Sequence, residues 1–248
     1  MITVLRHHSS LNKTSVTENN IQDGNVGNRG DILKHAILVQ LARLLKTSSS
    51  NHFTYLESHC YLYHSFLANN QWQSDIKTYL KTMPFVDDYY QLESAHVTQG
   101  QYLCSSGLVH QVIPEAEMLL CEHHAETRNK LVEQLKKNSA TYTLFNQIED
   151  IQSDHSSYET STLLALIDPF NFTDELWNTT GKVLQKILCE DAAVLMLVFD
   201  YRENEPDWSD NIAGLCRLAA TVSDSPYHLA VYSTEKLYQS VRDILHRD

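Results

Sequence analysis

Glycine and basic residues are both scarce in this sequence. Only seven of the 248 residues are glycine, so few positions offer the unrestricted backbone by which glycine-rich turns approach a ligand. Lys and Arg number 19 against 31 Asp and Glu, which gives a formal net charge of −12. A protein that binds nucleic acid through its phosphates normally has a basic face. The charge balance therefore favours a small-molecule or cationic partner over nucleic acid.

Long apolar runs and paired cysteines are absent as well. No segment approaches the ~18 apolar residues that a membrane span requires, and the N-terminus lacks the apolar core of a secretory signal. We therefore expect a cytoplasmic protein with no membrane partner. The five cysteines contain no CxxC pair, which predicts free thiols. Histidine occurs 13 times, but without HxxxH or HxH pairing beside an acid, so we predict no metal site.

An unbroken apolar run at residues 163–167 is the strongest strand signal in the chain. The run is short and stops at Asp168 and Pro169, which is typical of a central parallel strand buried on both faces. Proline cannot donate to a β ladder, so the strand ends there and the chain turns outward. Asp168 then lies at the carboxyl end of the strand, where open α/β sheets bind ligands.

Strand and helix patterns alternate along the whole chain. We predict strands over residues 53–57, 116–121, 142–145, 163–167, 193–200 and 228–232. Helical spacing predicts helices over residues 31–44, with Asp31 as N-cap, and over 102–112, 125–135, 174–189, 210–221 and 234–246. Alternation of this kind predicts an α/β fold, with a doubly wound, mostly parallel sheet and helices on both faces.

The predicted domain organisation has two parts. Residues 1–50 form an N-terminal lid segment and a helix, because residues 9–20 are polar and lack apolar periodicity. Residues 51–248 form a Rossmann-like domain with a small helical insertion at about 61–100.

Polar side chains follow the predicted strands at the point where each strand ends. Glu57 and His59 follow the first strand, Glu122 the second, and Glu149 and Asp150 the third. In a parallel sheet these positions share one edge. A carboxylate after the second strand suits a ribose diol, because it accepts two hydroxyl hydrogen bonds, and an acid after the third suits the amine of adenine.

The sequence Asp168-Pro169-Phe170-Asn171 suggests a catalytic platform. In amino-methylating enzymes an acid or amide, a proline and an aromatic follow the fourth strand. The first side chain accepts a hydrogen bond from the target amine, and the aromatic stacks on its ring, so catalysis is mainly positioning. The alternative is a simple Asp-Pro turn.

The N-terminal part carries a resemblance to a known family. NVGNRGDILKH at residues 25–35 resembles the HAGNxADVLKH signature of the ribosomal large-subunit methyltransferase J family, whose members methylate N6 of an adenine in 23S rRNA with S-adenosylmethionine. Leu5-Arg6-His7 stands where the family has Tyr-Arg-His, and LESHCY at residues 56–61 where it has Leu-Asp-Thr-His-Ala-Gly. Glu122 matches its ribose-binding Glu, and residues 168–171 match its Asp-Pro-Pro-Tyr.

The resemblance implies a class I methyltransferase fold, S-adenosylmethionine as cofactor and a set of site residues. The implied cofactor-binding residues are His35, His59, Ser105 or Ser106, Glu122, Glu149, Asp150 and Asp168. The implied catalytic residues are Asp168, Phe170, Asn171, Lys34 and His7.

The departures from the family pattern are as informative as the matches. Cys60 and Tyr61 replace the glycine-rich turn after the first strand, and bulky residues there fill space that the methionine moiety needs. Phe170 and Asn171 replace the second proline and the tyrosine of the tetrapeptide, and Leu5 replaces the leading tyrosine. Residues 9–23 are inserted, and the chain is acidic.

These observations leave four functions open. The first is an S-adenosylmethionine-dependent enzyme acting on a small molecule, which the altered tetrapeptide and the acidic charge favour. The second is an rRNA adenine-N6 methyltransferase. The third is a lyase or cyclase that acts on the aminobutyryl arm of S-adenosylmethionine and releases methylthioadenosine. In this enzyme aromatic residues cage the sulfonium by cation–π contacts, namely Tyr61, Tyr63, Phe170 and Phe172. The fourth is a non-enzymatic protein that binds the nucleoside or a partner.

Overall fold

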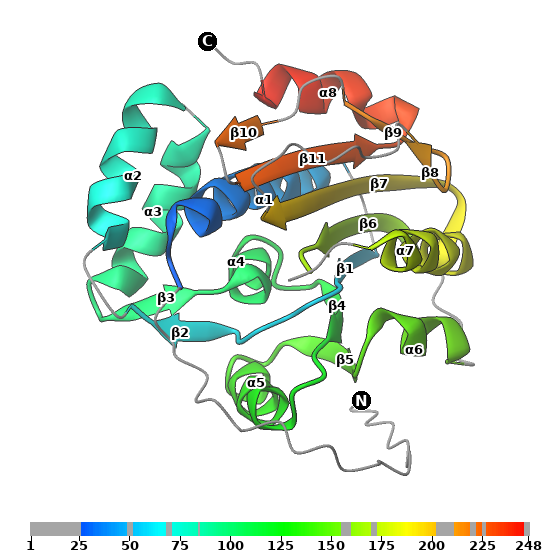
Figure 1. Cartoon of the computed structure of the whole chain (residues 1–248), viewed down its shortest axis with the longest axis horizontal. Coiled ribbons are helices and arrows are strands. Elements are labelled where there is room, and N and C mark those ends of the chain that lie inside the picture. Colours follow the sequence, from blue (N-terminus) through cyan, green and yellow to red (C-terminus); the bar gives the residue numbers. More distant parts are fainter. Residues whose placement is uncertain are drawn as a thin grey trace.

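A mostly parallel sheet runs through the middle of the molecule (Figure 1). The computed structural model describes residues 26–48, 52–67, 71–83, 85–154, 160–169, 173–201, 211–218, 222–224 and 227–245. Nine strands within these residues form the sheet, in the order β5-β4-β1-β6-β7-β11-β9-β8, with β10 paired to β11. The predicted N-terminal lid at residues 9–20 lies outside the described residues.

The centre of the sheet consists of five parallel strands. β1 (Phe53–Glu57) lies between β4 (Glu117–Cys121) and β6 (Thr160–Ile167). β5 (Thr141–Phe145) pairs with β4, and β7 (Leu188–Tyr201) pairs with β6. All five correspond to predicted strands, because each has an apolar or β-branched core that is buried in the structure.

The far side of the sheet contains an inserted antiparallel strand. β11 (Tyr227–Ser233) is antiparallel to β7 and also to β9 (Leu215–Arg217), so β9 runs parallel to β7. The parallel strands therefore follow the 3-2-1-4-5-6 order of dinucleotide-binding sheets, with one antiparallel strand between the fifth and sixth. This is the class I methyltransferase fold, and the predicted doubly wound α/β fold is confirmed.

Apolar side chains that alternate along the strands build one core on each face of the sheet. On β6, Leu164 and Leu166 face the first core, while Leu163, Ala165 and Ile167 face the second. Helices α1 (Arg29–Ser48), α4 (Ser105–Val112), α5 (Ala125–Lys137) and α8 (Glu235–Leu245) cover the first face. Helices α6 (Ile148–Ser153) and α7 (Asp174–Ile187) cover the second.

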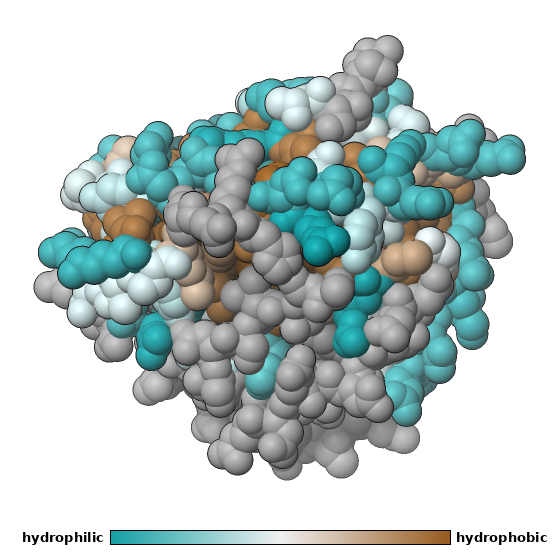
Figure 2. All heavy atoms as spheres, turned by 90° about the horizontal axis from the view of Figure 1, so that it is seen from above, coloured by the Kyte–Doolittle hydropathy of each residue, from teal (hydrophilic) through white to brown (hydrophobic). Residues whose placement is uncertain are grey.

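Helix α8 shows how such a layer forms. Leu237, Val241 and Ile244 recur at helical spacing and are buried, and each contributes roughly 2 kcal/mol through burial. Figure 2 looks down on this helix, and polar side chains cover most of the described surface there, with apolar side chains gathered in smaller patches. No helix among the described residues combines the length and the apolar character needed to cross a bilayer.

A small, mainly helical unit follows β1, as predicted, and Figure 1 shows it beside α1. It contains β2 (His64–Phe66), α2 (Gln71–Thr82), α3 (Val86–Val97) and β3 (Gln101–Leu103). β2 and β3 pair antiparallel, and α3 packs on α1. We call residues 64–103 the insertion. The prediction of a helix from Tyr102 was wrong at its start, because Tyr102 lies in β3 and α4 begins only at Ser105.

Two further local predictions were wrong. Within the helix predicted over 210–221, the described residues 211–217 form a hairpin of β8 (Asn211–Ile212) and β9, and β10 (Val222–Asp224) comes later. Ala213 and Gly214 have φ of 50° and 82°, which makes the two-residue type I′ turn that matches strand twist. Asp31 is not the N-cap of α1, because the helix begins at Arg29 and Asn28 caps it.

Candidate active site

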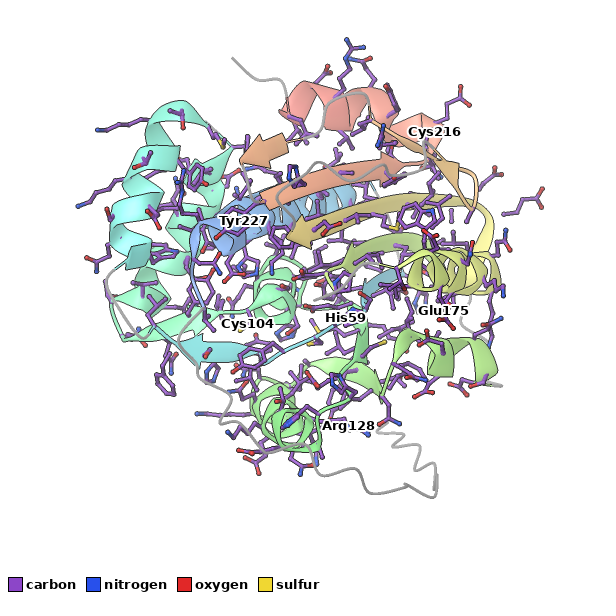
Figure 3. All side chains as sticks on the ribbon, viewed as in Figure 1. His59, Cys104, Arg128, Glu175, Cys216 and Tyr227 are labelled. Atoms are coloured by element: carbon purple, nitrogen blue, oxygen red, sulfur yellow. The ribbon has the colours of Figure 1, made fainter. Side chains whose placement is uncertain are left out.

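The carboxyl ends of β1, β4, β5 and β6 meet at one edge of the sheet. The register places Glu57, the last residue of β1, opposite Leu120 of β4 and Leu166 of β6. Figure 3 shows His59 near the middle of this edge, with Cys104 at the start of α4 to one side and Arg128 on α5 below it. The sequence-predicted acids at strand ends therefore share an edge, as expected for parallel strands.

The N-terminus of α1 brings two further site residues to this edge. Asn28 Oδ1 accepts a hydrogen bond from the Asp31 N–H at 3.1 Å, and Asp31 Oδ2 accepts one from the Gly27 N–H at 2.9 Å. The first contact is an N-cap, and the second ties the residue before the cap to the first turn, in place of the N-cap N–H that a capping box would use. Gly27 has φ of +79°, a conformation that favours glycine. One turn later, the rigid helix start presents Lys34 and His35.

Lys34 is buried between two carboxylates. Its Nζ atom lies 2.6 Å from Asp168 Oδ2 and 3.1 Å from Asp31 Oδ1, and it sits 5.2 Å from the ring centre of Phe199. Burial alone lowers the pKa of Lys34, but the charges of Asp168 and Asp31 outweigh it and raise that pKa. Burial alone likewise raises the pKa of Asp31, whereas Lys34 lowers it. Lys34 is therefore a fixed cation that orients the Asp168 carboxylate.

His35 lies beside this group and is kept neutral. Its Nδ1 is 2.9 Å from the Tyr102 hydroxyl, and its Nε2 is 3.1 Å from Ser105 Oγ. Burial, together with the positive charge of Lys34, lowers the pKa of His35 to about 3. A neutral imidazole donates through one nitrogen and accepts through the other, so Tyr102 and Ser105 together use both nitrogens of His35.

Glu57 carries a carboxyl group with an unusually high pKa at the end of the central strand. Its Oε2 accepts a hydrogen bond from the Tyr55 hydroxyl at 3.0 Å. Burial raises the pKa of Glu57 to about 7, against the hydrogen bond from Tyr55 and the charge of Lys34, which lower it. A group that titrates near neutrality can accept or release a proton during a reaction.

The loop after β1 is held by hydrogen bonds to both neighbouring strands. The Cys60 N–H donates to the Cys121 carbonyl at 2.7 Å, and the Ser58 N–H donates to the Leu166 carbonyl at 3.0 Å. Ser58 Oγ also accepts from the Asp168 N–H at 3.3 Å and lies 2.8 Å from His59 Nδ1. His59 thus connects to the Asp168 loop through a single serine.

The acids after β4 and β5 lie farther along the edge. Glu122 is nearly buried, its carboxylate accepts the backbone N–H of His124, and burial raises its pKa. Asp150 Oδ2 accepts the Asn146 N–H at 3.1 Å, and the Arg128 guanidinium donates to the Asn146 side chain. These contacts fix the loops that follow β4 and β5.

The structure brings some predicted site residues together and not others. Lys34 contacts Asp168 directly, and His35 contacts Ser105, while Ser106 instead donates to the Leu62 carbonyl at 3.4 Å. Glu122, Glu149 and Asp150 share the edge, where Glu122 and Asp150 accept hydrogen bonds from the backbone of their own loops, at His124 and Asn146. His7, Phe170 and Asn171 lie outside the described residues.

Sequence reasoning missed three partners of the site. Tyr55 and Tyr102 are fully buried and have hydrogen-bonding roles, but in the sequence they are indistinguishable from core aromatics. Asp31 was interpreted as a cap and also binds Lys34, three residues on. The spacing of Asp31 and Lys34 on one helix face was the available signal.

Comparison with known proteins supports the fold and leaves the activity open. No family model matches the chain, and no curated protein matches its sequence. Protein LPL1258 of family DUF519 from Legionella pneumophila has a TM-score of 0.64 and 16% identity, covering 89% of this chain and 91% of that one. A methyltransferase from Geobacter sulfurreducens has a TM-score of 0.46 and 7% identity, covering 81% of this chain and 78% of that one. Likeness at 16% identity shows a shared fold, and the resemblance to the ribosomal family stays a prediction.

Proposed function

We propose that this protein is an S-adenosylmethionine-dependent transferase that acts on a small molecule. The observation that carries the proposal is the Lys34–Asp168 ion pair at the carboxyl end of β6, with Nζ and Oδ2 2.6 Å apart. The Asp168 side chain is 19% exposed, so one carboxylate edge stays accessible to a ligand. A carboxylate fixed by a buried cation at a topological switch point is suited to position an amine or hydroxyl.

The residues present fit a nucleoside cofactor along most of the edge. Glu122 would hold the ribose, Asp150 the adenine amine, and Ser105, which His35 orients, a polar group of the ligand. The carboxyls of Asp31, Asp168 and Glu57 favour a ligand that carries positive charge, as the sulfonium and ammonium groups do. When bound, the cofactor supplies an electrophilic methyl group.

The chain's own residues then have separable roles. Asp168 accepts a hydrogen bond from the N–H or O–H of the acceptor and orients its lone pair. Lys34 prevents Asp168 from rotating, because the amine is itself held by Asp31. Glu57, with its pKa near 7, accepts the proton that the acceptor releases, directly or through water. Positioning supplies most of the rate enhancement in such a site.

A small acceptor is favoured over ribosomal RNA by charge. The chain has a net charge of −12, and the described site contains several carboxyl groups around one lysine. The carboxylates of such a site would repel a phosphate backbone. RNA would therefore have to bind through basic residues elsewhere, and that binding weakens as the salt concentration rises.

The loop after β1 favours one other candidate, a lyase that cleaves S-adenosylmethionine itself. Cys60 is 2% exposed and Tyr61 packs against the core, where related folds have glycines beside the methionine moiety. A filled pocket would bend the aminobutyryl arm and leave little room for an acceptor. The products differ between the two reactions, because a lyase releases methylthioadenosine and a transferase releases S-adenosylhomocysteine.

A single product analysis tests these functions. The wild-type protein and Asp168→Asn are incubated with S-adenosylmethionine, first alone, then with a library of small amines and alcohols, and then with 23S rRNA. We expect S-adenosylhomocysteine from the wild type only in the presence of a small acceptor, and strongly reduced amounts from Asp168→Asn. Methylthioadenosine without an acceptor would establish the lyase, and methylated rRNA would establish the ribosomal enzyme. Absence of both products and of cofactor binding by calorimetry would refute the enzymatic proposals.

A further inference from the structure

A buried chain of hydrogen bonds connects the insertion to the candidate active site. The Trp72 Nε1–H donates to the Tyr89 hydroxyl at 2.9 Å, and the Tyr89 hydroxyl donates to that of Tyr102 at 3.1 Å. The Tyr102 hydroxyl is 2.9 Å from His35 Nδ1, and His35 Nε2 is 3.1 Å from Ser105 Oγ. None of the five residues is more than 4% exposed. The chain therefore runs from α2 through α3 and β3 to α1 and α4 without access to bulk water.

The direction of this chain follows from the hydrogens that must find acceptors. An indole N–H can only donate, so the Tyr89 oxygen accepts from Trp72. The Tyr89 hydrogen then has one available partner among the described residues, the Tyr102 oxygen. The opposite direction would leave the Tyr89 hydrogen unpaired at a fully buried position, which is costly.

The same reasoning fixes the hydrogen on His35. Because the Tyr102 oxygen accepts from Tyr89, its own hydrogen goes to His35 Nδ1, which must be unprotonated. The imidazole hydrogen is therefore on Nε2 and is donated to Ser105 Oγ. The same pairing of hydrogens with acceptors excludes a positively charged imidazole. That ring carries a hydrogen on Nδ1, which would leave the Tyr102 hydrogen without an acceptor.

The chain ends at a hydroxyl whose hydrogen is not used inside it. Ser105 is the first residue of α4, and its oxygen accepts from His35. Among the described residues, no acceptor is available for the Ser105 hydrogen. Hydrogen bonds in series polarise one another, which strengthens the terminal donor.

We propose that Tyr89 and Tyr102 are positioning residues that fix His35 as the Nε2–H tautomer and make Ser105 a hydrogen-bond donor to an oxygen or ring nitrogen of the bound cofactor. The ligand part of this inference rests on the proposed function. The insertion thereby acts on the site through hydrogen bonds that begin at Trp72 of α2 and pass through Tyr89 of α3.

The tautomer is tested without any ligand. Protein labelled with ¹⁵N-histidine is examined by long-range ¹H–¹⁵N correlation, and the His35 signals are identified by comparison with His35→Asn. We expect the hydrogen on Nε2, and a shift of the Nδ1 resonance in Tyr102→Phe as its donor is lost. A hydrogen on Nδ1, or a doubly protonated ring, would overturn the proposal.

The action through Ser105 is tested by a double-mutant cycle on S-adenosylhomocysteine affinity, measured by calorimetry. We expect Ser105→Ala and Tyr102→Phe each to weaken binding by about tenfold, the effect of one hydrogen bond. The double variant should bind no more weakly than either single variant, because the second change removes an effect already lost. Additive losses, about hundredfold in the double variant, would refute the positioning role.

Two further variants keep the test interpretable. Tyr90→Phe removes a hydroxyl from the aromatic ring that stacks on Trp72 at 6.1 Å but has no place in the chain, so it should leave affinity unchanged. Equal weakening by Tyr90→Phe would refute the proposal. Tyr89→Phe replaces Tyr102→Phe in the cycle if the latter does not fold. If the wild type does not bind S-adenosylhomocysteine, the proposed function and the ligand role of Ser105 both fail. The NMR measurement of the His35 tautomer still tests the direction of the hydrogen-bond chain, because it needs no ligand.

Discussion

Lys34 and Asp168 lie 134 positions apart in the chain, and yet their side chains meet at 2.6 Å with both largely buried. Burying charges normally costs desolvation energy. Here the Lys34 amine offsets that cost with two carboxylates, because Asp31 also lies 3.1 Å from it. The ion pair ties the start of α1 to the end of β6. It is therefore both an anchor of the fold and the centre of the candidate site.

Replacing Lys34 should destabilise the protein substantially. Lys34→Met leaves two carboxylates without their cation, and breaking a buried pair in this way costs about 3 kcal/mol. Urea denaturation followed by tryptophan fluorescence measures the loss. Lys130→Met, which breaks the exposed pair with Glu126, is the control and should leave the midpoint nearly unchanged. An equal loss of stability in the two variants would show that the buried ion pair stabilises the protein no more than the exposed one.

Glu93 should make stability fall as pH rises. Its carboxyl is buried in α3, where Oε1 accepts the Leu103 N–H at 2.8 Å and Oε2 has no hydrogen-bond partner among the described residues. Burial raises its pKa from 4.5 to about 8, although the hydrogen bond from Leu103 lowers it. Because the native pKa exceeds the unfolded one, the stabilisation is complete below pH 4.5 and is lost as pH rises to about 8.

The variant Glu93→Gln isolates this effect. Relative to Glu93→Gln, the wild type should lose stability by roughly 1.4 kcal/mol per pH unit within that window. Unfolding free energies measured at several pH values provide the comparison. The exposed Glu126→Gln should keep the wild-type slope, and a Glu93→Gln slope equal to the wild type would contradict the assignment.

Two helical glycines should respond to alanine with opposite signs. A Cβ on Gly107 in α4 would lie 2.3 Å from the Tyr63 carbonyl oxygen, which is backbone and cannot rotate away. Gly107→Ala should therefore destabilise by about 1–3 kcal/mol. A Cβ on Gly181 in α7 would meet Ile212 at an ordinary 3.5 Å, so Gly181→Ala should stabilise by about 0.5–1 kcal/mol through helix propensity. Thermal unfolding of both variants gives the two signs.

The β8–β9 turn offers a stabilising change. Ala213 has a φ of 50°, which is unfavourable for alanine and tolerated by asparagine. Ala213→Asn creates the preferred Asn-Gly pair of a type I′ turn and should raise stability by roughly 0.5–1 kcal/mol. Gly214→Ala, at a φ of +82°, should have the reverse effect. A loss of stability in Ala213→Asn would argue against this turn.

The sequence predicted those parts of the fold that burial dictates. The core strands β1, β4, β6 and β7 were recognisable because parallel strands buried on both faces need apolar, aromatic or β-branched residues on both faces. The β8–β9 hairpin was predicted as a helix, since five residues of strand carry little periodicity and Ala-Gly is a weak turn signal.

The candidate site likewise contains residues that the sequence indicated and residues that it did not. Asp168 was predictable from its place after a buried apolar strand, whereas Lys34 and His35 were singled out only by a resemblance; the structure shows the contacts of all three. The roles of Tyr89 and Tyr102 were not predictable, because a buried aromatic gives one hydrophobic signal whether or not its hydroxyl is bonded. Hydrogen-bonded networks depend on tertiary distances, which no local pattern encodes.

The strand order also determines when the sheet can be completed during synthesis. β9 leaves the ribosome before β11, yet its partner in the sheet is β11, which separates it from β7. Until residues 227–233 have been made, the β8–β9 hairpin has no place to dock and β7 has an open edge. An exposed apolar edge of this kind is prone to wrong pairing. The edge of β7 therefore stays unpaired in the growing chain until β11 has been made, although β6, its other neighbour, is already available.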